Sequence, residues 1–395
     1  MSKVIVHIDL NAFFVRCEEI KDPSLENKAV AVGHLGRGGI VSTCSYEARK
    51  FGVRSGMPMN KAVQLCPHLI IVHPDYRFYV AMSHKFYNYI YSITHTIEMA
   101  SIDELFADFT EVIKKEKNVE EYFRHIQKTL YELTSLKCSI GVGPTKFLAK
   151  MGSDYQKPMG LTVIRKRDIP KMLYPLPIED MFGVGKKTAP RLKFIGVNTI
   201  GDLANSLSKN DEQVLNILGK FSFELRDWLN GKGSDKIYTV YDDPKSIGNS
   251  TTLKEDTSQF ETIKSTFEIL SEEVSERAKK EGKIGNTIQI MVKDTNYKAH
   301  NKSITFQNHT NDARDIFNHA IKLYEANFLD LPIRAVGVTL QNLIDIKDMK
   351  VQMTFFDYEH HEEESKTKLL INDINRKMKG QHLKRASEVR KNGNK

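Results

Sequence analysis

The stretch that decides the fold is Ser101-Ile102-Asp103-Glu104, together with His7-Ile8-Asp9-Leu10-Asn11-Ala12-Phe13-Phe14 near the amino terminus. Each stretch lies at the end of a short apolar run, Ile97 to Ala100 in the first case and Val4 to Val6 in the second. Such runs predict β-strands that carry acidic side chains to the rim of a sheet. If the two strands are neighbours, Asp9, Asp103 and Glu104 lie within a few ångströms of one another.

Three carboxylates placed that closely raise one another's pKa unless a cation neutralises them. Hard oxygen ligands favour Mg²⁺, which keeps part of its coordination shell for substrate phosphates. The cluster therefore predicts two-metal phosphoryl transfer, with metal ions roughly 3.5 to 4 Å apart. Either stretch alone is more typical of an ordinary strand end with solvated acids, so the prediction depends on the rest of the chain.

Four motifs in a fixed order give the chain a resemblance to the Y-family, or translesion, DNA polymerases of the DinB-like and UmuC-like kind. The resemblance runs from about Val4 to about Leu343. Its most specific pieces are Ile8 to Phe14, Ser42 to Pro58, Ser101 to Glu104, and Gly141 to Gly143 with Lys146, Ala149, Lys150, Lys157, Pro158 and Gly160 after it. It implies a bacterial DNA polymerase of this family with a multidomain α/β and α+β right-hand fold.

The expected domains follow from periodicity and turn residues along the chain. The bounds are palm, 1–11 and 74–164; fingers, 12–73; thumb with a helix-hairpin-helix, 165–233; linker, 234–244; little finger, 245–345; and basic tail, 346–395. In the palm we expect helices over Tyr79 to His95 and Val119 to Leu133, and strands over Val4 to Ile8, Ile97 to Ala100, Leu105 to Phe109 and Lys137 to Val142.

Composition is that of an ordinary globular protein, with 40% hydrophobic and 27% charged residues among 395. No apolar run reaches the roughly 18 residues of a membrane span, and the amino terminus does not read as a signal peptide. Four cysteines without CxxC spacing fit buried side chains in a reducing cytoplasm. These features predict a cytoplasmic protein that does not interact with membranes.

The net charge of +8 is concentrated at the carboxyl end. Residues 365–395 hold ten Lys or Arg against Asp373 and Glu388, which is +8 by itself and leaves residues 1–364 formally neutral. This tail can strengthen salt-sensitive binding to nucleic acid, or it can be a solvated chain end. Overall charge therefore says little about a DNA channel.

A grip for the substrate triphosphate is predicted in the expected fingers. Thr43, Tyr46 and Arg49 are spaced so that one helical turn would gather a hydroxyl, a phenol and a guanidinium on one face. Lys157 would add a point charge from the palm. The alternative is a core tyrosine and a surface ion pair, but the resemblance matches all four residues to the family's phosphate contacts.

Two aromatic residues follow Asp9 closely enough for one to face the sugar of a nucleotide held there. By resemblance Phe14 is the steric gate, whose ring excludes a ribonucleotide by a clash with the 2′-hydroxyl, while Phe13 fits either the site or the core. The family's roof over the templating base falls on Ile40 and Ser42. Ile40 is bulky for an open roof, which leaves the lesion preference open.

Two further segments suggest binding functions. Gly183-Val184-Gly185 with Lys186 and Lys187 resembles the hairpin of a helix-hairpin-helix, which binds DNA backbone through main-chain N–H groups. Gln352, Phe355 and Phe356 resemble the bacterial sliding-clamp peptide, although Thr354 stands where leucine is common. The alternative for the second segment is a hydrophobic strand end.

The leading function is template-directed, low-fidelity DNA synthesis in DNA repair by a monomer that uses primer–template DNA and deoxynucleoside triphosphates. Asp9 and Asp103, the Leu10 carbonyl and Glu104 would hold two Mg²⁺, with Mn²⁺ as a substitute. The alternatives are a non-catalytic DNA-binding regulator of repair, against which the intact acids count, and a glycosylase or nuclease. Asn11 departs from the Asp of many relatives, so we expect weaker charge there without loss of activity.

Overall fold

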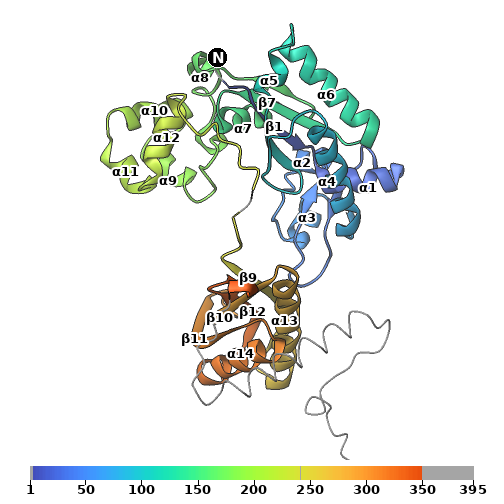
Figure 1. The fold of residues 1–395 in the computed structure, drawn as a ribbon, viewed down its shortest axis with the longest axis vertical. Helices are drawn as coiled ribbons and strands as arrows, with labels where there is room; N and C mark the ends of the chain where they lie inside the picture. The colour runs from blue at the N-terminus through green and yellow to red at the C-terminus, as the bar shows by residue number, and fades with distance from the viewer. Residues whose placement is uncertain (1–2, 241, 349–395) are drawn as a thin grey trace, which may run out of the picture. The chain divides into compact units, whose positions relative to one another are not determined.

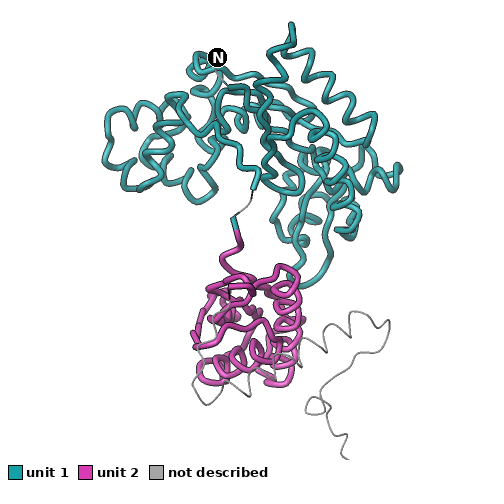
Figure 2. Tube along the Cα trace, viewed as in Figure 1, with its two compact units in different colours: residues 1–242 teal, residues 243–395 magenta. Residues whose placement is uncertain are grey.

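The structure is a computed structural model that describes residues 3–240 and 242–348 of the chain. The chain divides into two compact units, Met1–Asp242 and Asp243–Lys395 (Figure 2). Each unit has a hydrophobic core of its own, so each is described separately.

A five-stranded sheet forms the centre of the first unit (Figure 1). Its strand order is β5-β6-β1-β7-β8, with bounds β1 Ile5–Leu10, β5 Ile97–Met99, β6 Glu104–Asp108, β7 Cys138–Gly143 and β8 Leu161–Val163. β1 is antiparallel to both β6 and β7, and β7 is parallel to β8. The strands expected from the sequence are confirmed to within about two residues, and the two that carry acids are neighbours.

Helices cover both faces of this sheet because side chains of β1 alternate between the faces. Val6, Ile8 and Leu10 join a core with residues of α4 (Tyr76–Tyr91) and α6 (Val119–Thr134). Ile5 instead packs with Ala149 of α7 (Lys146–Tyr155). His7 and Asp9 lie on the same face as Ile5, so α7 is the helix that meets the polar side of the strand.

Gly141 of β7 allows α7 to approach the sheet at backbone distance. A Cβ atom built on Gly141 would lie 1.9 Å from the carbonyl oxygen of Ala149 and 2.2 Å from the backbone nitrogen of Ser153. Both neighbours are backbone atoms and cannot move aside as a flexible side chain can. The glycine therefore sets the distance between α7 and the strands that carry the candidate site.

Gly141→Ala is expected to destabilise the protein by about 3 kcal/mol or more, because the added methyl overpacks a backbone contact. Chemical denaturation followed by circular dichroism measures the change. Gly56→Ala is the control for the loss of a glycine, because a Cβ there meets no atom within 4 Å, although its positive φ of 79° adds local strain. An equal loss in the two variants would contradict close packing as the cause.

A smaller three-stranded sheet and short helices make up residues 12–73. β2 (Val30–Val32) lies between β3 (Thr43–Cys44) and β4 (Ile70–Val72), beside α1 (Phe13–Lys21), α2 (Tyr46–Lys50), α3 (Met59–Leu65) and the 3₁₀ turn η1 (Pro23–Leu25). The expectation that Thr43 shares a helical turn with Tyr46 and Arg49 is wrong. Ser45 caps α2 by accepting a hydrogen bond from the Ala48 N–H, so the helix begins after Thr43.

Short helices form residues 165–229. They are η2 (Lys166–Asp168), α8 (Ile169–Met172), η3 (Ile178–Asp180), α9 (Ala189–Phe194), α10 (Ile200–Ser208), α11 (Glu212–Leu218) and α12 (Phe221–Leu229), around a core of their own. α5 (Thr110–Ile113) is a further short helix near the large sheet. Residues 234–238, expected as the start of the linker, are held to the rest of the first unit, since the Tyr238 N–H donates to Glu98 and the Lys146 N–H to the Ser234 carbonyl.

The second unit is a four-stranded antiparallel sheet with two long helices packed on it. Its strand order is β11-β10-β12-β9, with β9 Ser246–Thr257, β10 Lys283–Asp294, β11 Ala299–Thr310 and β12 Ile333–Gln341. The helices are α13 (Phe260–Lys280) and α14 (Ala313–Asn327), and β13 (Ile344–Asp345) and η4 (Ile346–Asp348) follow. Gln352, Phe355, Phe356 and the rest of the tail from residue 349 lie outside the described residues.

Candidate active site

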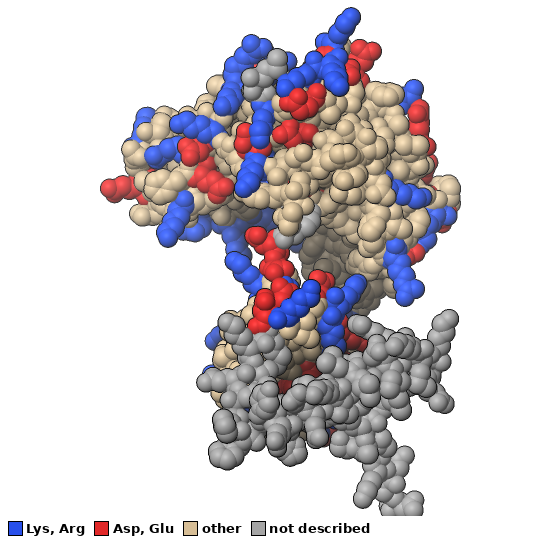
Figure 3. Space-filling view, viewed as in Figure 1, with Lys and Arg blue, Asp and Glu red and all other residues tan. Residues whose placement is uncertain are grey.

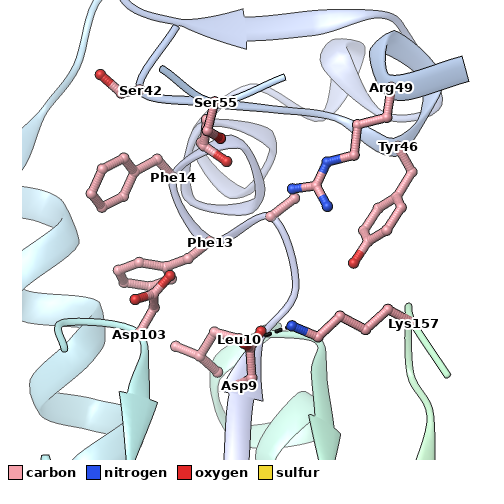
Figure 4. Close-up of a pocket in the computed structure, with 12 residues that line it drawn as sticks. Asp9, Leu10, Phe13, Phe14, Ser42, Tyr46, Arg49, Ser55, Asp103 and Lys157 are labelled. Carbon is pink, nitrogen blue, oxygen red and sulfur yellow. Dashed lines mark hydrogen bonds and ion pairs between the residues drawn. The ribbon is translucent and has the colours of Figure 1, made fainter. Parts of the chain in front are cut away.

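A cavity of about 220 Å³ opens where the end of β1 meets the segment of residues 42–55 (Figure 4). Its lining combines carboxylates, cationic side chains, hydroxyls and aromatic rings. The lining residues are Asp9, Leu10, Ala12, Phe13, Phe14, Ser42, Thr43, Tyr46, Arg49, Ser55, Asp103 and Lys157. Most of the residues predicted for the site thus lie together, and Ser55 and Ala12 are lining residues that the sequence interpretation missed.

Strand pairing brings the two acidic motifs together. Asp9 lies opposite Glu104 in the antiparallel register of β1 and β6, and the Leu10 N–H donates to the Asp103 carbonyl at 2.9 Å. The Asp103 carboxylate accepts a hydrogen bond from the Ser101 hydroxyl at 2.5 Å. The backbone therefore fixes Asp9 and Asp103 at adjacent strand ends, and both carboxylates line the cavity.

Two lysines pair with the carboxylates in this arrangement. Lys157 donates to Asp9 Oδ2 at 2.6 Å, and the Lys150 ammonium lies 3.5 Å from the same oxygen. Lys150 also donates to Glu104 Oε1 at 3.0 Å, and Glu104 does not line the cavity. Within the described part of the chain no three acids, histidines or cysteines are grouped as a ready ligand set, so the assignment of Asp9, Asp103 and Glu104 as metal ligands stays a prediction.

The electrostatics of the acids fit a site that takes up cations. Burial raises the pKa of Asp9 to about 7, against the opposing charge of Lys157. Burial and the nearby Glu104 charge also raise the pKa of Asp103. Burial works against ionisation of Glu104 too, but hydrogen bonds with His7 and Asp9 and the Lys150 charge hold its pKa below the usual value. Partly buried carboxylate oxygens of this kind match the ligand preference of a hard divalent ion.

Divalent metal binding is therefore expected to weaken as the pH falls below about 7, because a metal ion must displace the proton that Asp9 then carries. The apparent affinity should drop by up to about tenfold per pH unit below this value and level off above it. Calorimetric titration of Mg²⁺ into the protein without nucleotide, at about pH 6 and about pH 8, measures this dependence. Equal affinity at both values would contradict it.

The cationic and hydroxyl side of the cavity comes from α2 and the residues around it. The Arg49 guanidinium lies over the Tyr46 ring at 4.6 Å, and both side chains extend toward the cavity (Figure 4). Burial raises the pKa of Tyr46, so its phenol stays protonated and can donate a hydrogen bond. Thr43 reaches the same cavity from β3. Thr43, Tyr46 and Arg49 therefore do not share the one helix face that the sequence predicts, but all three side chains line the same cavity.

Asn11 holds the loop that presents Lys157. Its side-chain oxygen accepts from the Met159 N–H at 2.8 Å, and its side-chain nitrogen donates to the Ser139 hydroxyl at 2.9 Å. The residue is 4% exposed and does not line the cavity. Asn11 is thus a buried hydrogen-bonding link between β1 and the loop at 157–159, a role that the sequence pattern did not reveal.

The two phenylalanines differ in their surroundings. Phe13 is 2% exposed and belongs to the core, although one side of it reaches the cavity. Phe14 stacks on the Tyr79 ring at 4.4 Å, and the Tyr79 hydroxyl donates to Glu18 at 2.6 Å. Because Tyr79 is fully buried, it forms a firm wall behind Phe14. Phe14 therefore presents an aromatic surface of fixed position to the cavity.

The two predicted roof residues differ in position, and the hairpin residues lie outside the cavity. Ser42 lines the cavity, whereas Ile40 is 50% exposed and does not line it. Gly183 has a φ of 89°, and the hairpin closes through a hydrogen bond from the Val184 N–H to the Met181 carbonyl. Gly185, Lys186 and Lys187 follow on the surface before α9 begins. None of these hairpin residues lines the cavity, so they could contact DNA backbone without occupying the nucleotide site.

A sheet with acids at its rim, cationic and hydroxyl side chains beside them and a separate helical hairpin are typical of the class of nucleotidyl-transferring polymerases, and comparisons with known proteins agree. The impB/mucB/samB family model matches residues 8–154, its C-terminal domain model matches 244–355, and the IMS family HHH motif matches 166–197. DNA polymerase IV of Bacillus velezensis is 36% identical over 98% of this chain and 93% of the relative. For DNA polymerase IV of Alkaliphilus oremlandii the identity is 38% over 87% of each chain.

Solved structures show the same fold. A Y-family DNA polymerase chimera of Dbh and Dpo4 superposes with a TM-score of 0.75 at 28% identity, covering 87% of this chain and 99% of the chimera. The chain belongs to the impB/mucB/samB family of Y-family DNA polymerases and has their right-hand fold. Membership implies dependence on divalent metal ions and the use of DNA and nucleotides as substrates. None of the helices described is long and apolar enough to cross a membrane.

Proposed function

We propose that the cavity at the end of β1 is the site at which this DNA-directed DNA polymerase adds deoxynucleotides to a primer in low-fidelity translesion synthesis. The observation that carries the proposal is the convergence of Asp9 and Asp103, from adjacent strand ends, with Arg49, Tyr46 and Lys157 in one cavity. Carboxylates on one side and phosphate-binding groups on the other are the two requirements of nucleotidyl transfer.

Asp9, Asp103 and the Leu10 carbonyl would hold two Mg²⁺, with Glu104 joining or orienting them and Mn²⁺ able to substitute. When bound, the metal ions lower the pKa of the primer 3′-hydroxyl and neutralise the charge that develops on the phosphates. The oxygen donors fit this role, and two of the carboxylates already pair with ammonium groups, Asp9 with Lys150 and Lys157 and Glu104 with Lys150.

The chain's own side chains bind and orient the nucleotide. Arg49 offers a guanidinium fork to phosphate oxygens, Tyr46 and Thr43 offer hydroxyl donors, and Lys157 adds a compact positive charge. Lys157 would turn from Asp9 toward the triphosphate once cations neutralise the carboxylate. Phe14 would lie against the sugar and Ser42 near the base, with Phe13 supporting the floor from the core and Ile40 at the outer edge.

The position of this site suggests a role for each domain. We assign the palm to residues 1–11 and 74–164, the fingers to 12–73, the thumb to 165–233 and the little finger to 245–345. Gly183, Gly185, Lys186 and Lys187 would bind the DNA backbone without reading bases, since their N–H groups and ammonium groups fit phosphates. We assign the active form as a monomer in the cytoplasm, in line with four buried free thiols.

The experiment that tests the function is primer extension on undamaged and lesion-bearing templates with Mg²⁺ or Mn²⁺. Incorporation opposite the template base on both templates is expected. DNA binding without incorporation under either ion would favour the second candidate, a non-catalytic regulator of repair. The chemistry of the cavity speaks against that candidate, because both acids and all four phosphate-binding groups are present.

Replacing Gln352, Phe355 and Phe356 together by Ala is expected to abolish stimulation by the sliding clamp and to leave extension of a bare primer unchanged. An aromatic pair that fills a pocket on the clamp would raise the local concentration of enzyme at the primer end. Primer extension with and without purified clamp measures the effect. Equal stimulation of the parent and the variant would assign recruitment to another surface or to the basic tail.

A further inference from the structure

A second cavity of about 580 Å³ lies at the opposite end of the large sheet from the candidate active site. It is lined by Lys3, Val4, Val119, Glu120, Val142, Gly143, Pro144, Val163, Ile164, Arg165, Lys166 and Arg167, and we call it the valine groove. Val4 directly precedes β1 and Asp9 lies near the other end of this strand. The five residues between them correspond to about 17 Å at roughly 3.3 Å per residue. A molecule bound in the groove would therefore leave the nucleotide cavity free.

The floor of the valine groove is apolar and incompletely covered. Val4, Val119 and Val163 pack against the core of the first unit on one side and remain partly exposed on the other. They come from three separate places, the residue before β1, the first turn of α6 and the end of β8. Exposed apolar surface in a concave setting with a polar rim is typical of an interaction site.

The rim of the groove is basic. Arg165, Lys166 and Arg167 stand in a row on its edge, all three exposed, and Glu120 is the one acid in the lining. In Figure 3, Lys and Arg side chains gather with some acidic ones over the end of the first unit that carries the N mark in Figure 1. The rim therefore presents an excess of positive charge beside an apolar floor.

The basic row is held in place by its own backbone while its charged ends stay accessible. The Arg165 N–H donates to the Asp168 carboxylate at 3.0 Å, and the Asp168 N–H donates to the Arg165 carbonyl at 2.9 Å, which closes the turn. The guanidinium groups of Arg165 and Arg167 reach the Asp168 carboxylate only at 3.9 Å, with side chains 59% and 78% exposed. Both can turn to a stronger partner at little cost.

We propose that the valine groove binds an acidic peptide of a partner protein, with apolar side chains on the valine floor and carboxylates against Arg165, Lys166 and Arg167. Charge complementarity favours carboxylates over cationic groups, and the apolar floor favours a peptide over the phosphate backbone of nucleic acid, which has no apolar side chains to bury. This proposal does not depend on the proposed polymerase site, because the groove shares no lining residue with the nucleotide cavity.

The test measures fluorescence anisotropy of a labelled peptide that alternates aspartate and phenylalanine, titrated with the full chain. Control peptides replace every aspartate by lysine or every phenylalanine by serine, and an unlabelled single-stranded oligonucleotide serves as competitor. The parent protein is expected to bind the acidic, apolar peptide about tenfold more tightly than either control, because both halves of the groove contribute.

Two variants separate the contributions of rim and floor. Arg165→Ser with Arg167→Ser should weaken binding about fivefold, since two accessible charges are lost. Val119→Trp keeps the charges and fills part of the floor, and should weaken binding about tenfold. Lys114→Ser with Lys115→Ser removes two exposed charges of the same unit that do not line the groove, and should leave binding unchanged. Circular dichroism and extension of a bare primer, both expected to match the parent, show that the variants are folded.

Several outcomes would overturn the proposal. Binding of the serine control as tightly as the test peptide, or no effect of Val119→Trp, would show that only the basic rim binds the peptide and that the apolar floor contributes nothing. If the oligonucleotide fully displaces the peptide from the parent but not from the variant with Arg165→Ser and Arg167→Ser, the surface binds nucleic acid instead. If the control substitutions at positions 114 and 115 weaken peptide binding as much as the rim substitutions do, the peptide is attracted by the overall charge of the protein and not by the groove. If the parent does not bind the peptide at all, the proposed site does not exist.

Discussion

Asp103→Ala is expected to abolish nucleotide addition while leaving binding of primer–template DNA nearly unchanged. Asp103 lines the cavity from the start of β6 and supplies one of the two carboxylates assigned to the metal ions. The DNA-binding surface is assigned to other parts of the chain. Loss of metal-dependent stabilisation of the transition state should lower the rate of single-nucleotide incorporation at least about a thousandfold, which corresponds to roughly 4 kcal/mol.

The matched control is Asp108→Ala, which removes a carboxylate from the other end of the same strand. Asp108 accepts a hydrogen bond from the Thr110 N–H and lies 3.9 Å from the Lys3 ammonium, so its loss affects a turn and an exposed ion pair. This variant should lose some stability and keep its rate per folded molecule. Single-turnover incorporation and DNA binding by anisotropy measure both effects. An Asp103→Ala rate above a few per cent of the parent would show that Asp103 is not a metal ligand.

The strands and the acids could be predicted because each is a local property of the chain. The apolar run before Asp9 and the one before Asp103 are read directly from the residues, and their pairing in the β1–β6 register follows from a shared need for burial. Long amphipathic helices such as α6 repeat their apolar residues often enough to be located within a residue or two. The resemblance to Y-family polymerases then supplied the order of the domains.

The details that the sequence did not reveal depend on contacts between distant segments. Spacing alone predicts Thr43 on a helix, because it does not show that the Ser45 side chain caps α2 after Thr43. The sequence predicts only a weaker charge at Asn11, whereas its side-chain oxygen accepts a hydrogen bond from the backbone N–H of Met159, which lies 148 residues away. Pairing of Lys150 with Glu104 and Asp9 is equally nonlocal.

Residues 234–238 illustrate the same limit at the scale of domains. The sequence predicts them as part of the linker, yet Ile237 packs beside Ile5 and Phe106, and the Lys146 ammonium lies 5.4 Å from the centre of the Tyr238 ring. The valine groove was missed for a related reason. Its valines read as ordinary strand and helix residues, and only the folded chain shows that they share an open surface beside the Arg165 turn.

Phe14→Ala is expected to raise the ratio of ribonucleotide to deoxynucleotide kcat/KM by on the order of a hundredfold, because the clash with the 2′-hydroxyl disappears. The expectation depends on how firmly the ring is held. Phe14 stacks on Tyr79 at 4.4 Å and meets the edge of Tyr76 at 5.9 Å, and the Tyr79 hydroxyl is anchored by Glu18. A ring backed by a buried wall cannot retreat from an additional oxygen, so a ribonucleotide would have to move instead.

The matched control is Phe13→Leu, because Phe13 is the neighbouring phenylalanine but belongs to the core. That variant should lose stability through repacking and keep the parent's preference for deoxynucleotides. Steady-state incorporation of matched ribo- and deoxynucleotides gives the ratio for each protein, and thermal unfolding separates folding from selectivity. An unchanged ratio in Phe14→Ala would make Phe14 a core residue, whereas a changed ratio in Phe13→Leu alone would move the gate by one residue. Selectivity that depends on Phe14 alone would place the choice of sugar at this ring.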